Sequence, residues 1–139
     1  MKKGFPIIFL LYFQLCFAQN DSNQYLNIQK KLQSYDKIDC ISIGSLFIGK
    51  PYKKNILNKC YPNEKLNTSL NEFDCVTFVE TVLALNEDFH SSKPSFENFK
   101  NNLKYWRYRN GIIDCQNRLH YFSDWIQYHE IQKDIKNVT

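Results

Sequence analysis

The chain has 139 residues, 43% of them hydrophobic and 16% aromatic, which suffices for one globular domain and excludes a disordered chain. Its formal charge is +4, and without the two lysines Lys2 and Lys3 it falls to +2. That balance is too weak to indicate binding to nucleic acid, so we predict no nucleic-acid partner.

The first 18 residues show the three parts of a secretory leader. Lys2 and Lys3 form a basic start, an apolar run follows over 5–17, and Cys16-Phe17-Ala18 places small residues before Gln19. Because the apolar run is too short to span a bilayer comfortably, we predict a signal peptide over 1–18, with a retained anchor as the alternative. We therefore expect export to the periplasm or surface of a bacterium, with no stable membrane span after cleavage.

The segment after the leader predicts a helix, followed by less regular chain. Apolar residues at helical spacing indicate an amphipathic helix over 21–35, capped by Asp21 or Ser22. Residues 40–48 are apolar and predict a short helix or buried turn, and 53–63 is polar and irregular. Weak alternation over 64–70 could form a strand. The apolar positions of the first helix are Tyr25, Ile28, Leu32 and Tyr35.

The most informative segment is 73–86, which is apolar nearly all round and begins with Asp74, a good helix cap. A helix without a wide polar face belongs in a core, where Glu80 must meet water or a partner. A second amphipathic helix is predicted over 95–106, capped by Ser95, and Asn110-Gly111 predicts a turn. The tail over 127–139 is polar. The sequence offers few convincing strands, although the central helix needs apolar cover on all sides. This pattern suggests that a sheet covering the helix is missing.

Four cysteines remain after the leader: Cys40, Cys60, Cys75 and Cys115. In an oxidising compartment they could form two disulfides and carry no chemistry. Cys75 falls in the first turn of the central helix, where free N–H groups and the helix dipole stabilise a thiolate. From position alone, packing or a disulfide and a catalytic thiol both stay open.

Three separated motifs carry a resemblance to a known family. They are 73–80 (Phe-Asp-Cys-Val-Thr-Phe-Val-Glu), 107–111 (Arg-Tyr-Arg-Asn-Gly) and 118–126 (Arg-Leu-His-Tyr-Phe-Ser-Asp-Trp-Ile). Together with Gly49-Lys50-Pro51-Tyr52, this order resembles the N-acetylmuramoyl-L-alanine amidase-like family, a branch of the NlpC-type, papain-like cell-wall hydrolases.

The resemblance implies an α+β, papain-like cysteine hydrolase fold, represented over 19–139 mainly by its helical N-terminal half. It implies that Cys75 is the nucleophile, that the substrate is a muropeptide cut between N-acetylmuramic acid and L-alanine, and that no cofactor is needed. Family members are longer, and their general-base histidine lies in a Ser-His-Val-Gly-like motif without a counterpart here. We therefore expect weak or no activity, with a secreted, disulfide-stapled binding or structural remnant as the alternative.

Candidate residues around the site are Thr77, Arg109, Arg118, His120, Tyr121 and Asp124. For His120, a base, a group lining the site and a packed structural residue all stay open. The arginines could bind substrate carboxylates or pair with Glu80, Asp114 or Asp124. Asp124 could instead hold His120 or cap the next helix.

Other polar and aromatic residues are less informative. His90 and His129 lie in polar segments and are expected to be solvated, and no metal-ligand pattern is present. Several aromatic residues could stack on sugar rings, although helical spacing favours a core position for Trp106. These residues are Tyr105, Trp106, Tyr108, Tyr121 and Trp125.

Overall fold

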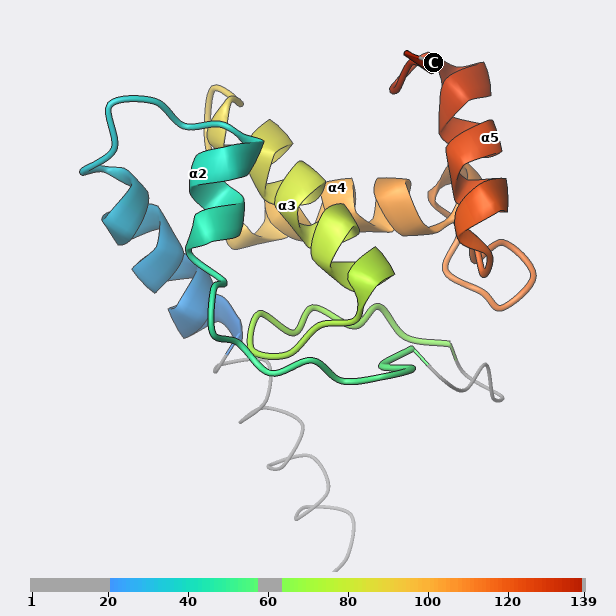
Figure 1. The fold of residues 1–139 in the computed structure, drawn as a ribbon, viewed down its shortest axis with the longest axis horizontal. Coiled ribbons are helices and arrows are strands. Elements are labelled where there is room, and N and C mark those ends of the chain that lie inside the picture. The colour runs from blue at the N-terminus through green and yellow to red at the C-terminus, as the bar shows by residue number, and fades with distance from the viewer. Residues whose placement is uncertain (1–20, 58–63, 139) are drawn as a thin grey trace, which may run out of the picture.

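The computed structural model describes residues 21–57 and 64–138, and this part of the chain is mainly helical (Figure 1). The predictions for the signal peptide and for residues 58–63 lie outside it. A helix covers 21–32, and the later helices are α2 (Cys40–Ser45), α3 (Cys75–Phe89), α4 (Phe96–Arg107), the 3₁₀ helix η1 (Arg109–Gly111) and α5 (Phe122–Gln132). No helix in the described ranges is long and apolar enough to cross a membrane.

The central helix α3 packs against α4 and against α2 (Figure 1). Its predicted start is confirmed, because the side chain of Asp74 accepts from the backbone N–H of Thr77 and forms a capping box. The 95–106 prediction is confirmed by α4, with Ser95 as its cap. Both helices bury their apolar faces in one core, which contains Val82, Ala84, Leu85, Phe99, Leu103 and Trp106.

The helix over 21–32 places Tyr25, Ile28 and Leu32 in this core, as predicted. It ends earlier than expected, and Tyr35 lies beyond it with 40% of its surface exposed. The predicted caps are wrong, because Asp21 and the residue after it are already helical. Asp21 instead accepts a hydrogen bond of 2.7 Å from the hydroxyl of Thr68, which ties the helix to the 64–70 segment.

The strand prediction for 64–70 is wrong. Within 21–57 and 64–138 the only β-type pairings are two isolated bridges, Tyr52–Phe73 and Tyr108–Arg118. The 64–70 segment pairs with side chains rather than with a neighbouring strand. For example, the carbonyl of Asn67 accepts a hydrogen bond of 2.7 Å from Nη1 of Arg107.

The first part of the polar tail is helical, since α5 continues to Gln132. His129 is fully buried rather than solvated, and its ring lies 4.6 Å from the rings of both Trp106 and Trp125. The tail sequence is polar overall, but α5 turns one aromatic face onto α4, and that contact could not be read from local composition. The predicted turn at Asn110-Gly111 is confirmed, with both residues at positive φ.

Replacing Ser95 with alanine is expected to lower the free energy of unfolding by about 1 kcal/mol. The Ser95 hydroxyl accepts from the backbone N–H of Asn98 at 3.1 Å, and alanine leaves that donor without its cap. Urea unfolding of both proteins measures the difference. Ser95→Asp, which restores an acceptor, should recover most of it, and a failure to recover would contradict the capping role.

Candidate active site

Cys75 is the first residue of α3, directly after the cap Asp74. Its thiol is free and exposed, and Cys40 is also a free thiol. The possibility that Cys75 is tied in a disulfide is therefore wrong. The thiol therefore stands at the first turn of a helix, next to a residue whose carboxylate caps that turn.

Thr77 stabilises the start of α3 and does not lie on an open surface. Its side chain is buried, and its hydroxyl lies 2.8 Å from Oδ1 of Asp74 and accepts from the Asp74 backbone N–H at 3.0 Å. These bonds fix the first turn of α3. Thr77 thus holds Cys75 in place indirectly, by securing the backbone on which the thiol stands.

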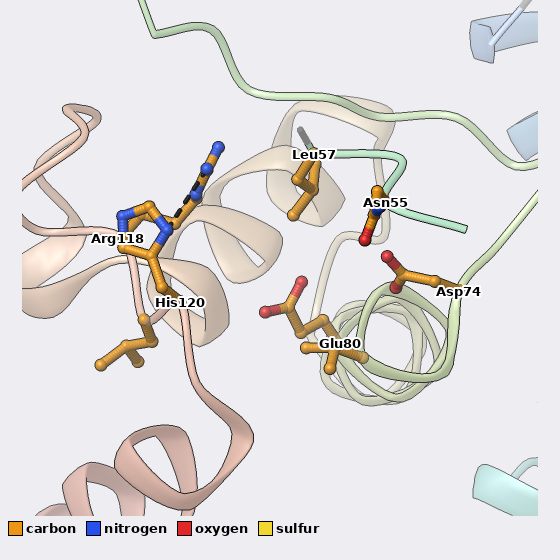
Figure 2. Close-up of a pocket in the computed structure, with 8 residues that line it drawn as sticks. Asn55, Leu57, Asp74, Glu80, Arg118 and His120 are labelled. Carbon is orange, nitrogen blue, oxygen red and sulfur yellow. Dashed lines mark hydrogen bonds between the residues drawn. The ribbon is translucent and has the colours of Figure 1, made fainter. Parts of the chain in front are cut away.

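A cavity of about 240 Å³ lies beside this helix start (Figure 2). The carboxylate side chains of Asp74 and Glu80 lie on one side of it, and Arg118 and His120 lie on the other. Cys75 is not among the lining residues, although both of its neighbours in sequence are. The lining is formed by Asn55, Leu57, Asp74, Val76, Glu80, Arg118, Leu119 and His120.

Arg118 is held by a buried ion pair in the cavity wall. Its Nη1 donates to Oε1 of Glu64 at 2.8 Å, and the Tyr108 hydroxyl donates to the same oxygen at 2.8 Å. Burial and the bond to Glu64 raise the pKa of the Tyr108 hydroxyl, so it remains a donor at neutral pH. The guanidinium is therefore fixed from behind while it lines the cavity.

His120 lines the cavity and has a described contact at each ring nitrogen. Nε2 lies 2.8 Å from the carbonyl oxygen of Cys115, and Nδ1 lies 3.4 Å from Nη2 of Arg118. Cys115 is itself in a disulfide. The structure thus brings together two of the predicted site residues, Arg118 and His120, and anchors the loop that carries them.

The other two arginines form ion pairs, as one of the alternatives predicted. Arg107 binds Glu80, and Nη2 of Arg109 lies 2.5 Å from Oδ2 of Asp124. Asp124 lies in the first turn of α5 and contacts Arg109, so it neither caps that helix nor holds His120. Tyr121 precedes α5 and is 75% exposed.

The aromatic candidates divide by burial. Trp106 is in the core, as predicted, and Tyr108 and Trp125 are buried as well, so these three do not offer a ring to a sugar. Tyr105 and Tyr121 keep exposed surface. Among the described residues, no group of three His, Cys, Asp or Glu side chains could hold a metal ion.

Among the polar residues, sequence reasoning missed Asn55, which lines the cavity, and Glu64, which holds Arg118 in the cavity wall. Glu64 pairs with Arg118 across 54 positions of sequence, a separation that no local pattern reveals. Asn55 adopts a φ of 58°, and asparagine is one of the few residues that tolerate this left-handed conformation. Its place in a polar, irregular segment was the only available signal.

The N-acetylmuramoyl-L-alanine amidase-like (AmiA-like) family matches residues 42–139. The chain belongs to this family. Two crystal structures of an N-acetylmuramoyl-L-alanine amidase from Bacteroides uniformis are similar to it, at 36% and 35% identity with TM-scores of 0.59 and 0.61. Each alignment covers 68% of this chain and 39% or 40% of the amidase.

A Bacteroides fragilis structure provisionally named a xylanase is also similar, at 38% identity and a TM-score of 0.57, over 65% of this chain and 39% of that one. No curated protein matches the chain. The chain thus spans about two fifths of the length of these solved relatives. The similarity supports the family and a partial, mainly helical correspondence, and the described residues by themselves contain no sheet.

Proposed function

We propose that this chain carries the nucleophile-bearing part of an exported, papain-like N-acetylmuramoyl-L-alanine amidase, with Cys75 as the nucleophile. The observation that carries the proposal is the free, exposed thiol in the first turn of α3, between two residues, Asp74 and Val76, that line a polar cavity. Family membership supports peptidoglycan as the substrate, since relatives in the family bear the name of an amidase acting on muramoyl-alanine bonds.

In the proposed reaction, the Cys75 thiolate attacks the carbonyl carbon of the muramoyl amide and forms a thioester. The C–N bond breaks, and the L-alanine nitrogen leaves as an amine after taking up a proton. Water then hydrolyses the thioester and restores the thiol. In this proposal the backbone N–H of Cys75 would help to stabilise the oxyanion, because N–H groups at the first position of a helix have no intrahelical partner.

Each of the chain's three histidines has described ring contacts with groups other than Cys75. The ring of His90 contacts the carbonyl of Asn86 at 2.7 Å, His120 contacts Arg118 and Cys115, and His129 is buried against α4. We propose that none of them serves as the base that activates the thiol, since the described contacts of their rings are with other groups. Loss of a catalytic base commonly costs orders of magnitude in rate, so we expect slow or undetectable turnover by this chain.

Thiol reactivity tests the nucleophile without requiring turnover. In a Cys40→Ser variant, Cys75 is the sole free thiol among the described residues, and iodoacetamide should modify it in the folded protein faster than it modifies Cys40 in a Cys75→Ser variant. Peptide mapping by mass spectrometry measures both rates. Equal rates would remove the support for an activated thiol and favour the non-catalytic binding protein.

Incubation with muropeptides tests the reaction itself. Any peptide released with a free L-alanine amino group should disappear in Cys75→Ser, and hydrolysis of xylan, assayed in parallel, should be absent. Release that survives Cys75→Ser would reject Cys75 as the nucleophile. Fast release that depends on Cys75 would instead reject the expectation that the base is lacking.

A further inference from the structure

We propose that Glu64 is a positioning residue that acts through Arg118 to hold His120 as the neutral, Nε2-protonated tautomer in the cavity wall. The inference rests on the proposed function for the role of the cavity. The tautomer itself follows from the contacts of Glu64, Arg118, His120 and Cys115.

The first step is the immobilisation of Arg118. The side chains of Glu64 and Arg118 are only 6% and 8% exposed, and their 2.8 Å contact is shielded from solvent. Tyr108 donates to the same Glu64 oxygen, so the carboxylate is restrained from a second direction. Because the guanidinium is a rigid planar fork, fixing Nη1 on Glu64 also fixes the direction in which Nη2 points.

The second step is the assignment of the His120 protons. A guanidinium nitrogen can only donate, so Nδ1 of His120, 3.4 Å from Nη2 of Arg118, must be the acceptor and carries no proton. A backbone carbonyl can only accept, so Nε2, 2.8 Å from the oxygen of Cys115, must carry the proton. The two contacts agree on one tautomer of the neutral ring.

The consequence concerns what His120 can do. Its proton points to the loop backbone and its lone pair points to Arg118, so the ring is an oriented, neutral part of the wall and not a base for the thiol. Glu64 also balances the charge of Arg118. Without Glu64, the guanidinium would be free to turn, and His120 would lose the contact that holds its Nδ1 unprotonated.

Long-range ¹H–¹⁵N NMR of the histidine rings reads this state directly. We expect one protonated and one bare nitrogen for His120 in the unmodified chain, assigned by comparison with His120→Gln. In Glu64→Gln the two ¹⁵N shifts should move toward each other as the tautomers mix. Glu72→Gln is the matched control, because its ion pair with Lys53 is partly exposed and lies outside the cavity lining, and it should leave His120 unchanged.

Arg118→Lys should produce the same change as Glu64→Gln, because lysine has no second fork nitrogen, and the double variant should show no more than either single one. Signals of His90 and His129 should stay fixed in all variants. A Nδ1-protonated or mixed His120 in the unmodified chain would overturn the proposal, and so would an unchanged His120 in folded Glu64→Gln. If Glu64→Gln does not fold, the ¹⁵N shifts of His120 in the unmodified chain and in Arg118→Lys still test the proposal. The readout involves neither turnover nor Cys75, so an unreactive Cys75 in the labelling experiment would count against the proposed function alone.

Discussion

Replacing Arg107 with methionine is expected to lower the free energy of unfolding by about 3–5 kcal/mol, because it leaves a buried carboxylate without its partner. Nε of Arg107 lies 2.7 Å from Oε2 of Glu80, and the two side chains are 2% and 1% exposed. Methionine retains an unbranched apolar stem, so the loss reports the unpaired charge together with the lost hydrogen bond to the Asn67 carbonyl. Since small domains are stable by only about 5–15 kcal/mol, urea unfolding should detect the change easily.

The penalty should depend on pH with a definite sign. Burial raises the pKa of Glu80, and Arg107 counteracts that rise, so its removal moves the folded-state pKa further above the unfolded value. A group whose pKa is higher in the folded than in the unfolded state stabilises the fold at pH values below its unfolded-state pKa. That stabilisation is lost as the pH rises through the folded-state pKa. The variant should therefore approach the unmodified chain in acid and fall behind it as pH rises.

A double replacement provides the control. Glu80→Gln in the Arg107→Met background removes the charge and should recover a large part of the stability and abolish the added pH dependence. A penalty that is the same at all pH values, or that persists in the double variant, would show that the lost packing of the arginine stem and its lost bond to the Asn67 carbonyl dominate over the unpaired carboxylate.

Helices whose signals are local could be predicted from the sequence. Asp74 and Ser95 mark the starts of α3 and α4 because capping requires only the three residues that follow. The 64–70 segment could not be assigned in this way. Its weak alternation resembles a strand, yet its conformation is set by partners distant in sequence, such as Arg107 and Arg118.

The candidate site shows the same division. The position of Cys75 and the need of Glu80 for a partner follow from one apolar helix pattern. The identity of that partner, the pairing of Glu64 with Arg118 and the engagement of both nitrogens of His120 depend on how the loops meet in space. Charge and spacing could name these arginines as candidates, but could not say which of them lines a cavity.

His129 is the second position where a large effect is expected. Its Nδ1 lies 2.8 Å from Oδ2 of Asp134, which also accepts from the Tyr105 hydroxyl at 2.7 Å. Its Nε2 lies 3.1 Å from the carbonyl of Trp106, and the ring is enclosed by Trp106 and Trp125. The residue therefore links α4, α5 and the segment after α5 through one buried ring.

His129→Ala is expected to lower the free energy of unfolding by about 3–5 kcal/mol, as for other buried aromatic truncations, because it opens a cavity between two tryptophans. His129→Phe keeps most of the ring volume and loses only the hydrogen bonds, so its loss should be about 1–3 kcal/mol.

His90→Ala, on an exposed ring, should change stability by less than about 0.5 kcal/mol in the same urea titration. If His129→Ala cost no more than His90→Ala, α5 would not be packed on α4 in solution. If His129→Phe cost as much as alanine, the hydrogen bonds rather than the packing would hold the helices together.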